Sequence, residues 1–236
     1  MRILVTNDDS ISAEQLLPLV KRLRKYGDVT VAVPKTEQSA KSHAIELHRA
    51  FSVEKQLLDK DATTYVIDST PSDCIRYAIL GLGLKFDLVV SGINRGLNMG
   101  TDILYSGTVA AIEEAGLQSV PAIALSTSPE YYDSALKHLD EVFDYILSRD
   151  LLKIHPLYNI NIPENPKGIK ITRQGGMYFS DSFINTEGDL YRANGKCVYK
   201  PSDDMTLDTN AVMSGYISIT PITIDVTDKE IFNRLK

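Results

Sequence analysis

Short apolar runs, several of them rich in β-branched residues, alternate along this chain with stretches of helical periodicity. Runs of this kind are typical of strands that are buried on both faces of a parallel sheet. They lie at residues 3–5, 29–33, 86–90, 121–125 and 158–162. Because parallel strands need crossover connections, the alternation predicts an α/β fold with three layers, in which a mostly parallel sheet has helices on both faces.

The pattern changes from about Pro163 onward, where short strand candidates lie among polar turns and no clear helix appears before the last dozen residues. The candidates lie at residues 170–173, 196–199 and 216–220. We therefore predict a core over residues 1–163 and a β-rich C-terminal extension over residues 164–236, packed on the core rather than folded as an independent domain. The strand expected at residues 215–221 has too little core of its own, so we expect its neighbour in another subunit.

Composition limits the classes of partner. The chain has 236 residues, enough for one main domain with an appendage, and its net charge of −6 argues against a surface that coats duplex DNA. Its two cysteines, Cys74 and Cys197, are far apart in sequence, which fits a reducing compartment and predicts neither a disulfide framework nor a zinc site. The first ten residues turn acidic before a signal-peptide core could form, and no apolar run is long enough to span a bilayer. We expect a cytoplasmic protein without a membrane partner.

Two adjacent acids, Asp8 and Asp9, follow the first predicted strand directly. Ligands of open α/β sheets bind at the carboxyl ends of the strands, so these carboxylates are placed to hold a cation or to handle protons. A single Asp at this point is commonly a turn or N-cap residue. Two adjacent carboxylates repel each other, and a divalent cation turns that repulsion into ligation, so the pair favours a functional interpretation.

Two further loops should reach the same edge of the sheet. Ser39 follows the second strand, and Asn94 follows the strand at residues 86–90 within a glycine-rich loop. A Ser hydroxyl, an Asn carboxamide and two carboxylates are all oxygen donors, and this set suits a hard cation such as Mg²⁺, Mn²⁺ or Ca²⁺ rather than zinc. Taken singly, residues such as Ser39 and Asn94 are more commonly turn residues that bond their own backbone.

Ser106, Gly107 and Thr108 precede a helical stretch and form a candidate anion site. Free backbone N–H groups, the positive end of the helix dipole and two hydroxyls suit a phosphate, although an ordinary Ser N-cap explains the same residues. His43 is a candidate proton donor or, alternatively, a structural hydrogen-bonding residue. Neither Gly-x-x-x-x-Gly-Lys-Ser/Thr nor Gly-x-Gly-x-x-Gly follows any predicted strand, so a nucleotide would be bound through its phosphate and a metal.

Six motifs occur in a fixed order along the chain, and together they are far more specific than any one of them. They are Val-Thr-Asn-Asp-Asp, Gln-Ser-Ala-x-Ser-His-Ala-Ile, Thr-Pro-Ser-Asp-Cys, Ser-Gly-Ile-Asn-Arg-Gly-x-Asn-Met-Gly, Tyr-Ser-Gly-Thr-Val and Gly-Tyr-Ile-Ser-Ile-Thr-Pro. In these motifs the chain resembles the SurE family (survival protein E) over nearly its whole length. The resemblance implies a Rossmann-like core, a metal-dependent phosphatase that acts on nucleoside monophosphates, and a C-terminal portion used in dimers and tetramers.

Matched residue by residue, the metal ligands of that family fall on Asp8, Asp9, Ser39 and Asn94. The resemblance thus implies one divalent ion per subunit, with Mg²⁺ or Mn²⁺ expected and Ca²⁺ able to occupy the site without supporting turnover. The sequence departs from the usual family pattern at Ser10, where Gly normally follows the two acids, and at Ser69, where Gly normally precedes Thr-Pro. If the backbone at Ser10 needs a positive φ, the serine costs strain.

We expect a phosphomonoesterase that hydrolyses nucleoside 5′-monophosphates, with 3′-monophosphates as an alternative substrate, by attack of a metal-activated water. Asp8 or Asp9 would take the proton of that water, while Asn98 and the helix start at residues 106–108 would hold phosphate oxygens. His43 belongs with this candidate phosphate and substrate site. A covalent variant, in which Asp8 or Asp9 attacks phosphorus, stays open at this point. We also expect a homodimer or homotetramer assembled through the C-terminal extension.

Two other classes of protein compete with this interpretation. A phosphoacceptor signalling module also carries an acidic pair after its first strand, but it needs an acceptor Asp and a Lys after later strands. In this chain those strands end in Ser91-Gly92 and in Ser126-Thr127-Ser128 instead. A non-catalytic nucleotide-binding protein that assembles through its C-terminal part would differ from an enzyme in releasing no phosphate from AMP.

Overall fold

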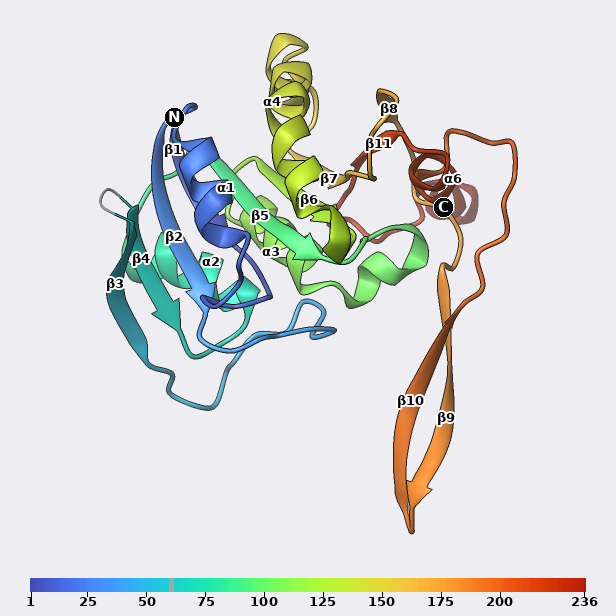
Figure 1. The fold of residues 1–236 in the computed structure, drawn as a ribbon, viewed down its shortest axis with the longest axis horizontal. Coiled ribbons are helices and arrows are strands. Elements are labelled where there is room, and N and C mark those ends of the chain that lie inside the picture. The colour runs from blue at the N-terminus through green and yellow to red at the C-terminus, as the bar shows by residue number, and fades with distance from the viewer. Residues whose placement is uncertain (60–61) are drawn as a thin grey trace.

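The structure is a computed structural model that describes residues 1–59 and 62–236, and it contains a sheet of nine strands (Figure 1). The strands of this sheet are β1 (Arg2–Thr6), β2 (Asp28–Pro34), β3 (Val53–Asp59), β4 (Ala62–Ile67), β5 (Leu88–Arg95), β6 (Ala122–Thr127), β7 (Leu157–Asn161), β8 (Ile169–Ile171) and β11 (Ile217–Pro221). Their spatial order is β3-β4-β2-β1-β5-β6-β7-β11-β8, and the pairs from β4 to β7 are all parallel. The predicted α/β class with a mostly parallel sheet is therefore confirmed.

Helices cover both faces of the sheet. The helices of the described residues are α1 (Leu16–Leu23), α2 (Pro71–Arg76), α3 (Gly107–Leu117), α4 (Tyr132–Ser148), α5 (Leu151–Ile154), α6 (Asp208–Met213) and α7 (Lys229–Leu235), with a π-helical turn η1 (Tyr77–Gly81) and 3₁₀ segments η2 (Gly100–Tyr105) and η3 (Pro129–Tyr131). Helices α1 and α4 pack on one face and α2 and α3 on the other. No helix in the described part of the chain is long and apolar enough to cross a membrane.

Strand β1 shows why the apolar runs predict a sheet that is buried on both sides. Successive side chains of a strand point to opposite faces. Ile3 and Val5 accordingly pack in the core beneath α1 and α4, and Leu4 packs in the separate core beneath α2 and α3. All three side chains are fully buried, so the edge at which β1 ends is held by two hydrophobic cores.

Helix α1 begins at Leu16, and the preceding Ser12 and Gln15 do not form a capping box although their spacing is typical of one. Gln15 is the N-cap residue but makes no side-chain cap, and Pro18 lies in the first turn, where a missing N–H costs little. The Gln15 carboxamide instead donates to Asp9 Oδ2 and to the Ile93 carbonyl oxygen, both at 2.9 Å. Gln15 thus supports one of the two acids.

The C-terminal extension continues the main sheet. Strand β11 pairs antiparallel with β7 and parallel with β8, so residues 215–221 find their neighbours in the same chain and the expectation of a neighbour in another subunit is wrong. Helix α6 was not predicted, because its six residues are too short to show a periodicity. Strands β9 (Phe179–Glu187) and β10 (Leu190–Cys197) form a hairpin that projects away from the body of the protein (Figure 1).

Candidate active site

The predicted metal-binding residues come from the carboxyl ends of three neighbouring strands. Asp8 and Asp9 follow β1, Ser39 follows β2, and Asn94 belongs to β5, which lies next to β1 on the other side. Strand β5 runs on to Arg95 instead of ending at residue 90, and Asn94 pairs with Ser126 of β6. Asn94 is therefore fixed by the sheet and does not lie in a free loop.

Three of the four predicted ligands line one small cavity of about 190 Å³. Asp8, Ser39 and Asn94 share it with Asn98 and Ser106, two of the predicted phosphate-binding residues. Asp9 lines a larger neighbouring cavity of about 360 Å³, and Arg95 lines both cavities. The four predicted metal ligands, with Asn98 and Ser106, thus line two adjoining cavities.

Asp8 is buried and has a precise orientation. The Thr108 hydroxyl donates to Asp8 Oδ1 at 2.5 Å, across 100 residues of sequence. Burial raises the pKa of Asp8 to about 6, the negative charge of Asp9 adds to this effect, and the Thr108 hydrogen bond opposes it. Gly107 permits the close approach of helix α3, because a Cβ at this position would lie 3.3 Å from Asp8 Oδ2. A buried carboxylate with a raised pKa is stabilised by a proton or a cation.

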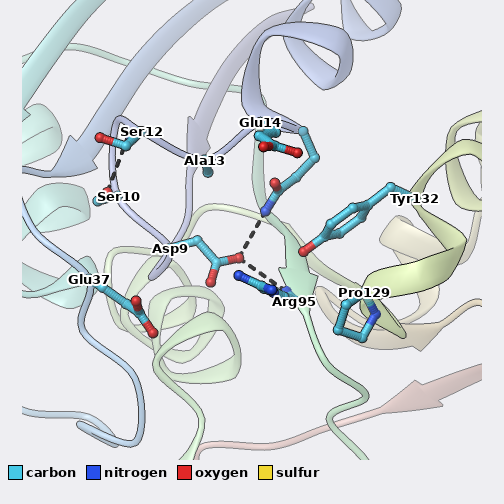
Figure 2. Close-up of a pocket in the computed structure, with 10 residues that line it drawn as sticks. Asp9, Ser10, Ser12, Ala13, Glu14, Glu37, Arg95, Pro129 and Tyr132 are labelled. Carbon is cyan, nitrogen blue, oxygen red and sulfur yellow. Dashed lines mark hydrogen bonds between the residues drawn. The ribbon is translucent and has the colours of Figure 1, made fainter.

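Asp9 is held by donors from two elements (Figure 2). Its Oδ2 accepts hydrogen bonds from Gln15 Nε2 at 2.9 Å and from the Arg95 backbone N–H at 3.0 Å. Burial also raises the pKa of Asp9, while the Arg95 amide bond opposes that shift. Ser10, which follows Asp9, has a φ of +75°. The backbone at this position thus adopts the positive φ at which a serine, unlike a glycine, is strained.

The donor atoms that face the smaller cavity fit a hard divalent cation. Asn94 Nδ2 donates to the Gly96 carbonyl oxygen at 2.8 Å, which leaves its Oδ1 as the atom available to a metal. The Ser39 hydroxyl donates to Glu37 Oε1 at 2.5 Å and keeps its oxygen lone pairs for the same purpose. The residues described contain no group of three or more His, Cys, Asp or Glu side chains that could hold an ion. A metal here would therefore rely on a mixed set of oxygen donors, which suits Mg²⁺ or Mn²⁺ better than zinc.

The start of α3 and Asn98 supply donors for an anion. Ser106 caps α3 by accepting from the Val109 N–H at 3.1 Å, and the first amides of the helix, at Gly107 and Thr108, have no acceptor within it. Asn98 Nδ2 donates one hydrogen to the Ser126 hydroxyl at 2.9 Å, which leaves its second hydrogen for a ligand. The Asn161 side chain both accepts from the Asn98 N–H and donates to its carbonyl oxygen, so the position of Asn98 is fixed.

His43, in the segment that follows β2, packs against α3 and is not among the residues that line the two cavities. Its Nδ1 is 3.3 Å from Glu113 Oε2 and its Nε2 is 3.1 Å from Glu114 Oε2. Hydrogen bonds to Glu113 and then Glu114 raise the pKa of His43 to about 9. The ring therefore links the segment between β2 and β3, which carries Ser39, to α3, whose first turn contacts Asp8.

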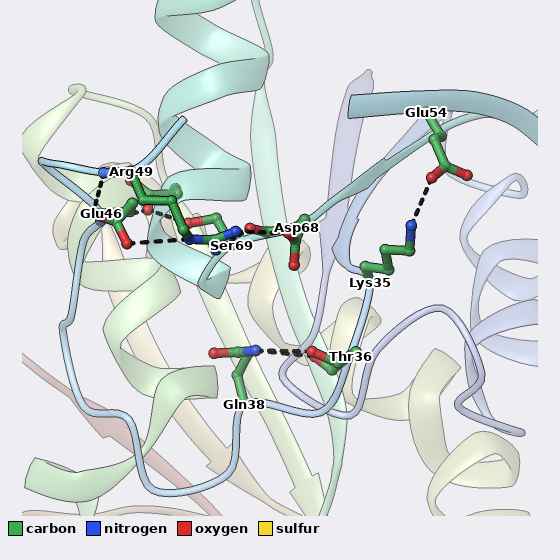
Figure 3. Close-up of polar contacts among 9 residues, drawn as sticks. Lys35, Thr36, Gln38, Glu46, Arg49, Glu54, Asp68 and Ser69 are labelled. Carbon is green, nitrogen blue, oxygen red and sulfur yellow. Dashed lines mark hydrogen bonds and ion pairs between the residues drawn. The ribbon is translucent and has the colours of Figure 1, made fainter. Parts of the chain in front are cut away.

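The same segment is anchored at both ends by ion pairs (Figure 3). Lys35 Nζ lies 2.8 Å from Glu54 Oε1, and Arg49 Nη1 lies 2.7 Å from Asp68 Oδ2. Near Ser39, the Gln38 backbone N–H donates to the Asp8 carbonyl oxygen at 2.8 Å. These contacts hold Ser39 beside Asp8 although the segment contains no helix or strand.

Four further residues, Arg95, Tyr132, Glu37 and Asp208, belong to the site or support it and were not predicted as functional residues. Arg95 is the last residue of β5, in a stretch that the sequence presents as a loop, and Tyr132 is the first residue of α4. Glu37 lies two residues before the predicted Ser39. Asp208 lies in a region read as turns, where it accepts from the Gly100 and Gly175 amides at 3.0 and 2.8 Å. Glu37 and Arg95 are sequence neighbours of predicted ligands, whereas Tyr132 and Asp208 reach the site only through the tertiary structure.

Comparison with known proteins gives one consistent family. A family model described as "Survival protein SurE" matches residues 3–181. The "5'-nucleotidase SurE" of Thermoanaerobacter sp. (strain X514) is 40% identical to this chain, and the match covers 100% of this chain and 97% of that protein. The "5'-nucleotidase SurE" of Thermosipho africanus is 37% identical, and the match covers 100% of this chain and 96% of that protein. The crystal structure of the Sure protein from Aquifex aeolicus superposes on this chain with a TM-score of 0.82 at 28% identity, and the match covers 100% of this chain and 98% of that chain.

Proposed function

The chain belongs to the SurE family and is a phosphatase of the 5′-nucleotidase class, and we propose that it hydrolyses nucleoside 5′-monophosphates with the help of one divalent metal ion per subunit. The observation that carries this proposal is the small cavity in which Asp8, Ser39 and Asn94 adjoin the first turn of α3. Oxygen donors for a cation and N–H donors for a phosphate thus face one space.

Each part of this site has a chemical task. Asp8, Asp9, Ser39 and Asn94 would hold a divalent ion, which would supply Lewis-acid polarisation of the phosphoryl group and lower the pKa of an attacking water. The α3 amides and the free Asn98 hydrogen hold the phosphate oxygens, where they stabilise the charge of the transition state. Asp8 or Asp9 accepts the proton of the water.

Asp8→Asn and Asp9→Asn test this assignment, and Asp87→Asn is the matched control because Asp87 pairs with Arg2 on the surface. We expect each site variant to lower kcat by about a hundredfold or more, since it removes a ligand charge and a proton acceptor, and the control to keep wild-type activity. Phosphate release from 5′-AMP and 3′-AMP, after chelation and add-back of single metals, measures the effect. Wild-type turnover by either site variant at saturating metal contradicts its role, and a trapped acyl-phosphate supports the covalent alternative.

Assembly is a second part of the proposal. Apolar side chains on the β9–β10 hairpin are exposed, with Phe183 at 73% and Leu190 and Tyr191 at 66%. A projecting hairpin with an apolar surface is suited to pack against another subunit. We therefore propose a homodimer or homotetramer assembled through the C-terminal extension. The two cysteines are free thiols, which agrees with action in the cytoplasm.

A further inference from the structure

The larger cavity adjoins the proposed phosphate site and has no role in the chemistry described so far. Its volume is about 360 Å³, which lies within the range of small-ligand pockets. Asp9 and Arg95 line it on the side of the metal site, and Tyr132 lines it from the start of α4 (Figure 2). A ligand whose phosphate occupies the smaller cavity can therefore extend past Arg95 into this space.

Tyr132 is the aromatic residue among those that line this cavity, and its hydroxyl has no hydrogen-bond partner among the described residues. The hydroxyl oxygen is buried and points toward Arg95 and Asp9 (Figure 2). A buried hydroxyl without a partner destabilises a protein, so its presence calls for a ligand or another compensating role. The ring itself is only partly buried and offers a flat apolar surface on which a heterocycle can stack.

The charges of the lining select the kind of ligand. Asp9, Glu14 and Glu37 contribute carboxylates, whereas Arg95 is the one cation among the residues that line the cavity. Such a surface accepts hydrogen bonds and repels additional phosphate groups. A group with several N–H or O–H donors, a flat ring and no charge satisfies it. The ribose hydroxyls and the base of a nucleoside have these properties.

We propose that this cavity binds the nucleoside part of the substrate, with the base against the Tyr132 ring and its polar edge or the ribose hydroxyls toward Glu14, Glu37 and the Tyr132 hydroxyl. The proposal rests on the proposed function, because the phosphate of the same molecule must occupy the neighbouring site. It makes Tyr132 a determinant of specificity for nucleotides over other phosphomonoesters.

The first test compares two substrates in two variants of the metal-loaded enzyme. Tyr132→Leu removes the aromatic ring, and Tyr131→Leu is the matched control, because the neighbouring tyrosine bonds Glu164 and does not line the cavity. The measured quantity is the ratio of kcat/KM for 5′-AMP to kcat/KM for glycerol phosphate, which has no base. We expect Tyr132→Leu to lower this ratio by about tenfold, at the low end of what a stacked base contributes, and the control to keep it. An unchanged ratio in Tyr132→Leu, or an equal fall in the control, overturns the proposal.

The second test does not depend on turnover. Tyr132→Phe removes only the unpartnered hydroxyl, so we expect the Tm of the free protein to rise while the affinity for adenosine, measured by calorimetry, falls by about threefold or more. A hydroxyl with a purely structural role would change the Tm without changing adenosine binding, and that result overturns its proposed contact. If wild type binds adenosine but hydrolyses neither phosphomonoester, the proposed function fails and the nucleoside site stands. If wild type hydrolyses 5′-AMP but does not bind adenosine, the nucleoside site fails alone.

Discussion

The ion pairs of His43 predict a specific pH dependence of stability. The ring lies between Glu113 and Glu114 of α3, and 29% of its side-chain surface is exposed. Its pKa is raised from 6.5 to about 9, so the folded state binds the proton more tightly than the unfolded chain. The stabilisation is therefore fully present below pH 6.5 and is lost as the pH rises through 9.

The size of the effect follows from the same two values. Each pH unit between the folded and unfolded pKa corresponds to about 1.36 kcal/mol, which gives an upper limit of about 3.4 kcal/mol for the shift from 6.5 to about 9. Solvent screening of the partly exposed ring reduces this, and we expect about 2–3 kcal/mol. Burial alone would raise the pKa of Glu114, but His43, Gln118 and Arg76 hold it below its usual range. That shift describes the same ion pair from its other partner and is counted once.

Urea unfolding of wild type and His43→Gln across this pH range measures the contribution. We expect the difference in unfolding free energy between the two proteins to shrink by about 2–3 kcal/mol from below pH 6.5 to above pH 9. NMR titration of the ring gives the pKa directly, and Glu113→Gln should lower it, whereas Glu141→Gln, next to His138, should not. A His43 that titrates near its ordinary value, or a constant difference in stability, would refute the reasoning.

Three further predictions concern single elements. In thermal unfolding, the Ser10→Gly variant should be about 1 kcal/mol more stable than the Ser10→Ala variant. Both variants lose the Ser10 hydroxyl that accepts from the Ser12 N–H, but only glycine relieves the strain of the positive φ. Equal stabilities would show that no strain is present. Thr108→Val should lower kcat for 5′-AMP by about tenfold, since Asp8 loses the donor that orients it, and unchanged kinetics would contradict that role. Replacement of residues 180–196 by a short Gly-Ser linker should reduce the mass measured by light scattering while circular dichroism still reports a folded core, and an unchanged mass would exclude the hairpin from the interface.

The parts of the fold that were predictable depend on local signals. The run at Ile3–Val5 places β1, and with it Asp8 and Asp9, because a strand buried on both faces shows in a few consecutive residues. Thr70 caps α2 as its sequence context indicates, by accepting from the Asp73 N–H at 3.1 Å.

The parts that were not predictable depend on contacts between distant segments. The glycines after Val90 resemble a loop, but pairing with β6 continues β5 to Arg95. Gln15 matches a capping signal, but it bonds Asp9 and the Ile93 carbonyl 78 residues away. Local propensity does not contain such contacts, because they form only when the tertiary structure brings the partners together.

The buried Asp208 carboxylate, which holds the Gly100 and Gly175 amides, has a consequence for how the protein is made. Gly100 begins the η2 segment that leads into Ser106, so the geometry of the phosphate site depends on a residue near the end of the chain. During synthesis on the ribosome, β1 to β7 emerge well before Asp208 and before β11, which completes the pairing of β7. We therefore expect nascent chains to form the parallel part of the sheet first and to acquire phosphatase activity only when Asp208 and β11 have left the exit tunnel.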